Sequence, residues 1–378
     1  MKPTPHDGPT QNSKLKTRNS RLRRRLLAWF DAARRDLPWR RDRDPYRIWV
    51  SEVMLQQTTV AAVVPYFERF LRAFPSLRDL AAAAEQDVLR LWEGLGYYRR
   101  ARDLHRAARQ LVTTHGGTIP DAPEALGELP GLGRYTVGAI LSQAFDRRLP
   151  VLEANSLRVL CRLFGRADDP RRGPARRWLW QAAEDLLPHR RVGDFNQALM
   201  ELGALVCTPT APRCEACPLA DDCVARRLGR QDEIPAKAPP PAITEVREAA
   251  VVVRRGADVL LAQRPESASR WANLWEFPHG PVGDRESHEA AALRLARELA
   301  GLDVALGPEL LTLRHGVTRY RITMVCFEAG YAGGEFRSDF YRQGRWLAPG
   351  RLADYPVSAP QRRLANVLTA PQRQRNLF

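Results

Sequence analysis

A chain of 378 residues is long enough to bury two hydrophobic cores, so its length predicts two folded domains. The formal net charge of +16 argues against an acidic or neutral binding surface and favours a polyanionic partner, most commonly nucleic acid. The N-terminus has no apolar stretch of signal-peptide or membrane-span length. We therefore expect a cytoplasmic, nucleoid-associated protein without membrane contact, whose six cysteines are metal ligands or buried thiols rather than disulfides.

Residues 1–20 are rich in Pro, Ser, Asn and Lys and predict a disordered basic arm. Residues 21–228 show helical periodicity interrupted by Pro and Gly, which predicts an all-α domain. Its helices are expected to include Ile48–Val63, Tyr66–Phe74, Ala101–Thr113, Tyr135–Phe145 and Phe195–Val206. Its breaks are expected at Pro65, Pro75, Gly94–Gly96, Gly116–Gly117 and Pro130–Gly131.

Residues 229–246 are rich in proline and predict a stiff, extended linker. Residues 247–370 then have the mixed texture of an α+β domain, and residues 371–378 are expected to be a tail. The elements expected in this domain are strands at Ala249–Val253 and Val259–Gln263 around a turn at Gly256, a helix at Glu286–Ala300, and a strand at Tyr320–Phe327. The predicted fold is therefore multi-domain, all-α followed by α+β.

A tight hairpin is expected between a short helix at Ala125–Leu129 and a second helix that begins at Arg134. Gly131 and Gly133 let the backbone turn there, with its N–H groups pointing outward at a helix N-terminus, where they can bind a phosphate. Taken alone, the motif is equally compatible with a plain connection between two helices.

Four cysteines, Cys207, Cys214, Cys217 and Cys223, follow the spacing C-x6-C-x2-C-x5-C. Four thiolates in one short loop suit a [4Fe-4S] cluster, in which each thiolate binds one iron. Zinc remains the alternative, although structural zinc sites usually present two C-x-x-C pairs and this loop has one. Neighbouring arginines predict that the loop contacts DNA phosphate. The other two cysteines, Cys161 and Cys326, lie in apolar surroundings and are expected to be core thiols.

Together these motifs resemble the helix–hairpin–helix glycosylase (endonuclease III) superfamily, and within it the MutY-type adenine DNA glycosylases. The resemblance is dense over residues 22 to about 228 and looser in the C-terminal domain. It rests on LPWR (Leu37–Arg40), SEVMLQQT (Ser51–Thr58), GLGYYRRAR (Gly94–Arg102), LPGLGRYT (Leu129–Thr136), FNQALMELGA (Phe195–Ala204) and the cysteine run. It implies an enzyme that flips a base out of duplex DNA and hydrolyses its N-glycosidic bond.

Excision of adenine needs an acid for the leaving base and a negative group near the oxocarbenium-like sugar. Glu52 is the candidate acid, because the resemblance assigns that role to its position and its apolar neighbours would raise its pKa. Without the resemblance, a Glu at the start of the expected helix would more simply stabilise the helix dipole.

The second carboxylate departs from the family pattern. The family has Asp in a V-L-D-G-N segment, where this chain has Val151–Asn155 with Glu153 in the place of Asp. Three interpretations stay open: Glu153 does the work of the Asp from a shifted backbone, which we favour, the enzyme is slow, or it acts on another base. Asn155 matches the family and is an expected contact with substrate DNA.

Tyr135 occupies the position at which relatives resembling endonuclease III have a lysine, which forms a Schiff base and cuts the strand. This chain has no lysine between Lys16 and Lys237. The helical domain therefore lacks an internal lysine nucleophile, and we predict a monofunctional glycosylase.

The resemblance also implies contacts with the flipped base and the gap that it leaves. The amide of Gln197 suits the N6/N7 edge of adenine, and Arg40 completes the pocket with Glu52. Leu55 and Gln57 match residues that fill the gap in the duplex, although Leu55 alone would more often be a core residue.

The C-terminal domain has the spacing of a Nudix box at Gly280, Glu286, Arg294, Glu298 and Gly301. Two glutamates that help bind magnesium in Nudix hydrolases are replaced by Leu295 and Leu299, which argues against a pyrophosphatase.

In MutY-like proteins the C-terminal domain reads 8-oxoguanine opposite the adenine. Their Phe-Ser-His loop is here Val317–Arg319, in which Thr318 keeps a hydroxyl for the lesion and Arg319 offers a contact with a guanine edge. We therefore expect a monomeric base-excision-repair enzyme that binds double-stranded DNA and removes adenine mispaired with 8-oxoguanine or guanine. The alternatives are a glycosylase for another lesion or mismatch, and a catalytically weakened mismatch-binding protein.

Overall fold

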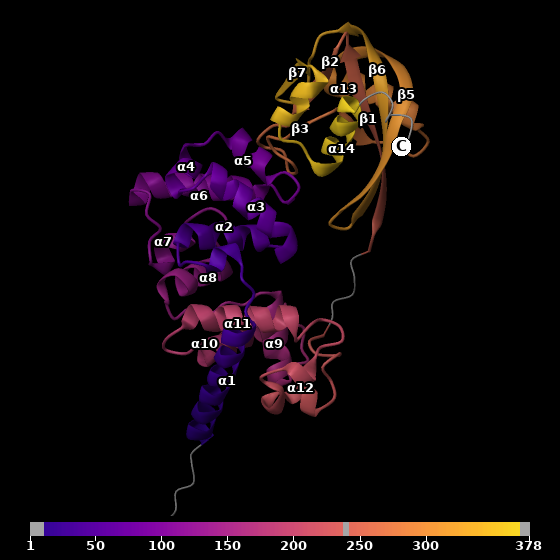
Figure 1. Cartoon of the computed structure of the whole chain (residues 1–378). Coiled ribbons are helices and arrows are strands. Elements are labelled where there is room, and N and C mark those ends of the chain that lie inside the picture. The colour runs from indigo at the N-terminus through magenta and orange to yellow at the C-terminus, as the bar shows by residue number, and fades with distance from the viewer. Residues whose placement is uncertain (1–10, 237–241, 371–378) are drawn as a thin grey trace, which may run out of the picture. The chain divides into compact units, whose positions relative to one another are not determined.

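The structure is a computed structural model that describes residues 11–236 and 242–370. Its helices (Figure 1) are α1 (Gln11–Ala33), α2 (Pro45–Leu55), α3 (Val60–Ala73), α4 (Leu77–Ala82), α5 (Glu85–Trp92), α6 (Arg99–His115), α7 (Pro123–Gly127), α8 (Arg134–Phe145), α9 (Ala154–Phe164), α10 (Gly173–Leu186), α11 (Val192–Leu205), α12 (Val224–Arg227), α13 (His288–Ala300) and α14 (Ala359–Thr369). Its strands are β1 (Thr244–Arg255), β2 (Asp258–Gln263), β3 (Trp275–Glu276), β4 (His279–Pro281), β5 (Leu302–Val317), β6 (Tyr320–Gly334) and β7 (Gln343–Leu347). Among the described residues, no helix is long and apolar enough to cross a membrane.

The chain divides into two compact units. The first comprises residues 1–71, 76–78 and 107–239, and the second comprises residues 72–75, 79–106 and 240–378. Residues 79–106, which we expected within the helical domain at 21–228, thus group with the C-terminal residues. They do so through side chains: Trp275 Nε1 donates to Gln86 Oε1 at 2.9 Å, and Arg362 pairs with Glu93 at 2.6 Å.

Helix α1 begins at Gln11, so the expectation of a disordered arm at residues 1–20 is wrong for residues 11–20, while residues 1–10 lie outside the described part. Leu22, Leu26 and Phe30 recur every four residues and are buried in the core of the first unit. Arg18 donates to the main-chain carbonyl of Asp222 at 3.1 Å, 204 residues further along the chain. The composition of residues 11–20 did not predict this helix, because contacts with the distant loop around Asp222 help to stabilise its N-terminal half.

Residues 48–63 were expected to form one helix, and they form parts of two. α2 ends at Leu55 and α3 begins at Val60, with Gln57 between them in a left-handed conformation (φ 58°). Pro65 was expected to break a helix, but it lies inside α3. A proline near the helix start removes one hydrogen bond, a loss that is small beside the burial of Val63, Phe67 and Phe70 on one face.

The linker predicted at residues 229–246 is folded at both ends. Ile234 is 1% exposed in the core of the first unit, and Arg162 Nε donates to its carbonyl at 2.9 Å. At the other end, β1 already begins at Thr244. The remainder of the predicted linker includes residues 237–241, which lie outside the described part.

The second unit contains one mixed seven-stranded sheet in the order β3-β2-β1-β6-β5, with β4 beside β1 and β7 beside β2. The expected strands lie within β1, β2 and β6, and the expected helix is α13. Side chains alternate along β1, so that Val251 and Val253 pack against α13 and Ala250 and Val252 against α14. Both faces of the sheet are therefore covered, which leaves the β5–β6 hairpin as its projecting feature.

Candidate active site

Glu52 is buried near the end of α2, with 4% of its surface exposed beside the buried side chains of Val53 and Met54. We expected it at the start of a helix, but α2 begins at Pro45, after the N-cap residue Asp44. Glu52 is thus more than a turn from the positive end of the helix dipole. Dipole stabilisation does not explain a carboxyl at this position.

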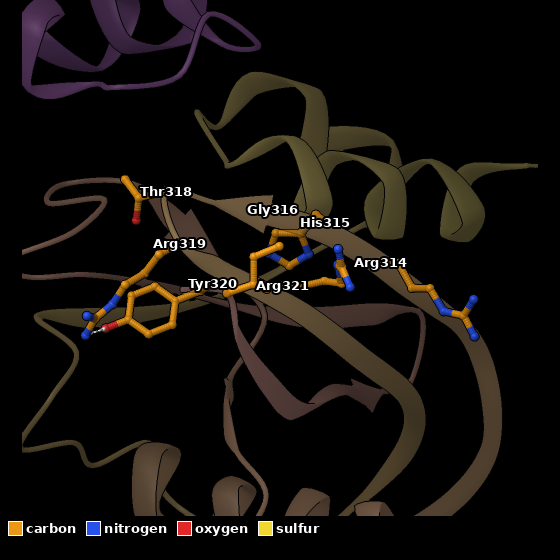
Figure 2. Close-up of a pocket in the computed structure, with 8 residues that line it drawn as sticks. Arg314, His315, Gly316, Thr318, Arg319, Tyr320 and Arg321 are labelled. Carbon is orange, nitrogen blue, oxygen red and sulfur yellow. Dashed lines mark hydrogen bonds between the residues drawn. The ribbon is translucent and has the colours of Figure 1, made fainter. Parts of the chain in front are cut away.

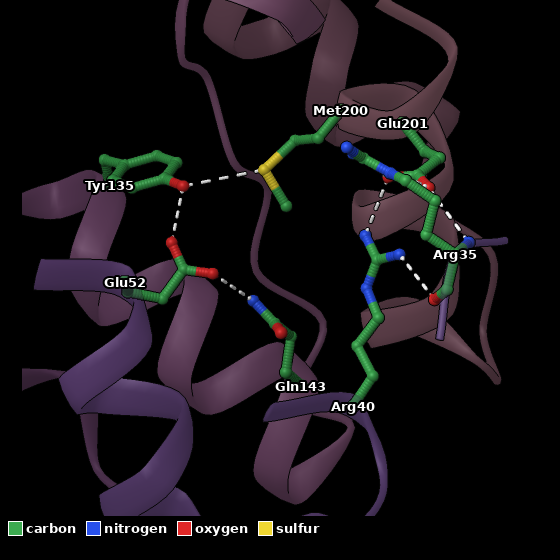
Figure 3. Close-up of polar contacts among 7 residues, drawn as sticks. All are labelled: Arg35, Arg40, Glu52, Tyr135, Gln143, Met200 and Glu201. Carbon is green, nitrogen blue, oxygen red and sulfur yellow. Dashed lines mark hydrogen bonds and ion pairs between the residues drawn. The ribbon is translucent and has the colours of Figure 1, made fainter. Parts of the chain in front are cut away.

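Both oxygens of the Glu52 carboxyl have hydrogen-bond donors (Figure 3). Tyr135 Oη donates to Oε2 at 2.6 Å, and Gln143 Nε2 donates to Oε1 at 2.8 Å. Burial raises the pKa of Glu52 and outweighs these hydrogen bonds; the charge of Glu153 raises the pKa further, and that of Arg40 lowers it. Glu52 therefore keeps its proton to a higher pH than an ordinary Glu does, as a general acid requires.

Helix α8 supplies both partners of Glu52. Tyr135 lies in its first turn and Gln143 lies eight residues later on the same face. In the hairpin before it, Gly131 has a left-handed conformation (φ 78°), which glycine adopts without strain, and Gly133 is the N-cap of α8. One helix thus carries the expected phosphate-binding turn at its N-terminus and two side chains that contact Glu52.

Glu153 is the N-cap residue of α9. Its carboxylate accepts hydrogen bonds from Ser156 N at 2.7 Å, from Asn155 N at 2.8 Å and from Asn155 Nδ2 at 3.1 Å. In return, Glu153 N donates to Ser156 Oγ at 2.9 Å, which completes a capping box. N-cap residues usually have a shorter side chain, such as Ser, Thr, Asp or Asn. Here the Glu153 carboxylate caps the helix, and each of its oxygens accepts a main-chain hydrogen bond.

Arg158 connects Glu153 to the cysteine loop. Its guanidinium donates to Asn155 Oδ1 and to the Gly203 carbonyl, both at 2.8 Å, and to the carbonyl of Cys207 at 2.7 Å. Asn155 in turn donates to Glu153. The packing is tight at this point, because a Cβ on Gly203 would lie 2.6 Å from that of Asn155. The first cysteine of the run and the capping carboxylate therefore share one hydrogen-bonded network.

Replacing Arg158 with Met should lower the free energy of unfolding by roughly 3 kcal/mol, since several buried acceptors would lose their donors. Denaturant unfolding of the cluster-loaded protein measures this, and the exposed Arg176, changed to Met, is the matched control. Equal stability of the two variants would contradict the network.

A pocket of about 230 Å³ in the first unit is lined by Trp39, Ile48, Arg40, Gln143 and Gln197, among others. It brings together the two expected base-contacting residues, Arg40 and Gln197, with Gln143, the partner of Glu52. The other lining residues are mainly charged, namely Arg34, Arg41, Asp42, Arg43 and Asp194. The aromatic ring of Trp39 and the two amides among the lining groups suit contacts with a flipped nucleobase.

Glu201 holds Arg40 in the pocket wall. Arg40 Nη2 donates to Glu201 Oε2 at 2.9 Å, and Arg35 Nη2 donates to the same oxygen at 2.7 Å (Figure 3). Burial alone would raise the pKa of Glu201, but the two guanidinium groups outweigh it and hold the pKa at about 2. Glu201 is therefore a permanent anion that fixes Arg40. This role was not predicted from the sequence, although a lone Glu within the apolar FNQALMELGA segment was a usable signal.

The expected wedge residues lie where the backbone leaves α2. Leu55 is the last, half-buried residue of the helix, and Gln57 is exposed with positive φ. A second strained residue was missed: Tyr97 is 51% exposed with φ 46° in the Gly94–Arg102 segment of the second unit. Strain combined with an exposed aromatic ring is typical of ligand-contacting loops.

All four cysteines of the run line one pocket, and three of them pack against the core of the first unit. Within residues 11–236 and 242–370, no three His, Cys, Asp or Glu side chains are placed to share a single metal ion. Four thiolates that line a single pocket fit a [4Fe-4S] cluster, in which each thiolate binds one iron. A positive side chain lies beside the cysteines, because Arg162 Nη1 donates to Cys207 Sγ at 3.3 Å. This cation suits the negative charge of cysteine thiolates.

Thr318 lies at the tip of the β5–β6 hairpin, in a separate unit from Glu52. Its hydroxyl donates to the Val317 carbonyl at 2.7 Å, so only its lone pairs remain for another partner. Figure 2 shows Arg319 beside the Tyr320 ring, and its Nη2 donates to the Tyr320 hydroxyl at 3.2 Å. Thr318, Arg319 and Tyr320 line a hollow of about 370 Å³ together with Arg314, and none of the described residues that line it is acidic.

The Nudix-box carboxylates are engaged with an arginine. Arg294 pairs with Glu286 at 2.8 Å and with Glu298 at 2.9 Å. Leu295, in the position of a magnesium-binding glutamate, is buried against Gly280 in the apolar core around α13. In this box the remaining acidic groups and the leucine stabilise the helix and its packing.

Three family models match the chain. Residues 50–185 match the HhH-GPD superfamily of base excision DNA repair proteins, residues 207–223 match the iron-sulfur binding domain of endonuclease III, and residues 249–367 match the NUDIX domain. The protein is thus a DNA-binding, helix–hairpin–helix base-excision-repair glycosylase followed by a Nudix-like domain, as predicted, and its cysteine loop binds a [4Fe-4S] cluster.

Adenine DNA glycosylases are similar to most of the chain. That of Rattus norvegicus is 36% identical over 92% of this chain and 77% of its own length, and that of Homo sapiens is 35% identical over 92% and 74%. Among solved structures, a thermostable thymine-DNA glycosylase is 30% identical, with a TM-score of 0.51 over 56% of this chain and 98% of its own. The chain belongs to the adenine DNA glycosylase family.

Proposed function

We propose that this enzyme hydrolyses the N-glycosidic bond of adenine mispaired with 8-oxoguanine or guanine in double-stranded DNA. The observation that carries the proposal is the buried Glu52 carboxyl with a raised pKa, next to a polar pocket of nucleobase size. Glu52 and the pocket residues Arg40, Gln143 and Gln197 all lie in one compact unit. The predicted monomeric state and nucleoid location stay predictions.

The reaction needs two carboxyl groups in different protonation states. Glu52 gives its proton to the adenine as the bond between C1′ and the base breaks and the bonding electrons leave with the base. The carboxylate of Glu153 then stabilises the positive charge on the sugar. A water molecule adds to C1′ and gives one proton to the carboxylate of Glu52, which restores the acid and leaves an abasic site. Because Tyr135 occupies the place of the lyase lysine, the strand stays intact.

DNA binding is distributed over residues that carry no bond-breaking role. Gly131 and Gly133 form the phosphate-binding turn, Gln197 and Arg40 contact the flipped base, and Leu55 and Gln57 enter the gap in the duplex, with Tyr97 as a further aromatic contact. The cluster holds the loop at residues 207–223, which we propose to lie against phosphate, as its neighbouring arginines suggest.

The test is release of free base by the cluster-loaded enzyme from duplexes that contain every base pair and 8-oxoguanine. Adenine release from A·8-oxoguanine and A·G, with unbroken strands, supports the proposal. Release of thymine from T·G instead would favour the second candidate, a glycosylase for another mismatch, to which the thymine-DNA glycosylase likeness points. Mismatch binding without any release would favour the weakened, binding-only protein.

Changing Arg319 to His should raise the ratio of adenine excision at A·8-oxoguanine to that at A·G about tenfold. An arginine can only donate, which suits the N7 and O6 acceptors of guanine, whereas 8-oxoguanine has an N–H at N7. Single-turnover rates on the two duplexes measure the ratio, and Thr318→Ser, which keeps the hydroxyl, is the control. An unchanged or lower ratio in Arg319→His would contradict a role of this loop in reading the opposite base.

A further inference from the structure

The two oxygens of the Glu52 carboxyl face chemically different partners. The phenol of Tyr135, next to Oε2, can donate or accept a hydrogen bond. The Nε2 of Gln143, next to Oε1, can only donate. Glu52, Tyr135 and Gln143 are held together by the packing of α2 against α8, and Gln143 is 7% exposed.

This difference decides where a proton can reside. A proton on Oε1 would point at the N–H of Gln143 or force the hydrogen bond to break, whereas a proton on Oε2 can be donated to the Tyr135 oxygen. Tyr135 then has an acceptor for its own hydrogen, since Met200 Sδ lies 3.5 Å from its hydroxyl (Figure 3). With the Gln143 amide oriented as in the structure, its Nε2 toward Glu52, the protonated acid is thus fully satisfied in only one of its two forms.

We infer that Gln143 is a positioning residue that keeps Oε1 of Glu52 as an acceptor and so places the transferable proton on Oε2. This inference rests on the proposed function of Glu52 as the acid. Gln143 also lines the pocket proposed for the base, whereas Tyr135 and Met200, on the Oε2 side of Glu52, are not among its lining residues. The Oε2 proton must therefore leave its hydrogen bond with Tyr135 before it is transferred to the base. The resemblance to the glycosylase family assigned no role to this position.

The electrostatic surroundings of Glu52 give the sign of the expected effect. The charged or titratable groups that act on it are Tyr135 from α8, Glu153 from the cap of α9, and Arg40. Gln143 is uncharged, but its hydrogen bond favours the carboxylate and lowers the pKa of Glu52. Removing it therefore raises that pKa, so the acid keeps its proton to a higher pH.

The test compares the wild type with Gln143→Leu and Gln143→Met, which keep similar side-chain size and remove the donor. Single-turnover adenine excision is measured from pH 5 to 9 on the A·8-oxoguanine duplex. We expect a rate on the order of tenfold lower at the acidic plateau, because the proton is no longer confined to one oxygen. We also expect the alkaline fall in rate to move to higher pH.

Gln197→Leu is the matched control, because it removes an amide from the same pocket without a hydrogen bond to Glu52. Gln197→Leu should slow the reaction, but the rate should fall at the same alkaline pH as in the wild type. A fall that stays in place or moves to lower pH in both Gln143 variants would overturn the inference. Absence of adenine release by the wild type would instead overturn the proposed function.

Infrared spectroscopy tests the same inference without turnover. At pH 5 the C=O stretch of protonated Glu52 is identified by its loss in Glu52→Gln. If Oε1 is the carbonyl oxygen that accepts from Gln143, this band moves to higher frequency in Gln143→Leu and Gln143→Met and stays in place in Gln197→Leu. A band that does not move in the Gln143 variants would overturn the inference even if one variant is poorly active.

Discussion

Glu52→Gln should release adenine at least on the order of a thousandfold more slowly than the wild type, while it still binds the mismatched duplex. The amide has the size of the carboxyl and can keep a hydrogen bond to Tyr135 and to Gln143, but it has no proton to give to the leaving base. The buried position of Glu52 means that no solvent acid easily replaces it.

Single-turnover excision and duplex affinity, measured on the same preparation, separate chemistry from binding. Tyr135→Phe is a useful comparison, since it removes one partner of Glu52 and leaves the acid itself. If Glu52→Gln retained more than about a tenth of the wild-type rate, a different group would have to be the acid.

Glu153→Gln should slow excision on the order of a hundredfold, because it removes the negative charge next to the developing positive charge on the sugar. The amide oxygen can still accept from one main-chain N–H of α9, so most of the helix cap should survive. A rate loss with a small change in thermal stability is therefore the expected pattern.

Glu153→Asp is the matched variant, because it keeps the charge and has the shorter side chain that N-caps prefer. We expect its rate to lie within about tenfold of the wild-type rate, since the Glu carboxylate is already fixed by three hydrogen bonds. A rise of a hundredfold or more in Glu153→Asp would show that the natural Glu is misplaced, and would favour the weakened, mismatch-binding interpretation.

The parts of the fold that depend on local pattern were predictable. The cysteine loop, the Pro-Gly hairpin and the strands at Ala249–Val253 and Tyr320–Phe327 depend on residues close in sequence. The hairpin lies between α7 and α8 and the two strands lie within β1 and β6, as predicted, and the cysteine loop matches an iron-sulfur domain. The helix at residues 11–20 was not predicted, because its stability comes from contacts such as that of Arg18 with Asp222.

The candidate site also contains residues that the sequence predicted and residues that only the structure identifies. Glu52, Arg40 and Gln197 belong to segments that resemble a known family. The structure places them in one unit, with Arg40 and Gln197 in one pocket wall and Glu52 hydrogen-bonded to Gln143 of that wall. Gln143 lies outside those segments, and a polar residue on a mostly buried helix becomes interpretable only when its partner is known. Glu201 lies within one of them, FNQALMELGA, but its role depends on its pairing with Arg35 and Arg40, which only the structure shows. Glu153 was recognised as a departure, but its action as a helix cap follows only from the backbone at α9.

The most direct test of the central claim is the pH dependence of single-turnover adenine release by the wild-type, cluster-loaded enzyme. Because burial raises the pKa of Glu52, the rate should be constant at acidic pH and fall only as the pH rises through a value above the ordinary Glu range. The residual rate of Glu52→Gln should lack this fall. A wild-type rate that increases with pH, or a fall that persists in Glu52→Gln, would contradict proton donation by Glu52.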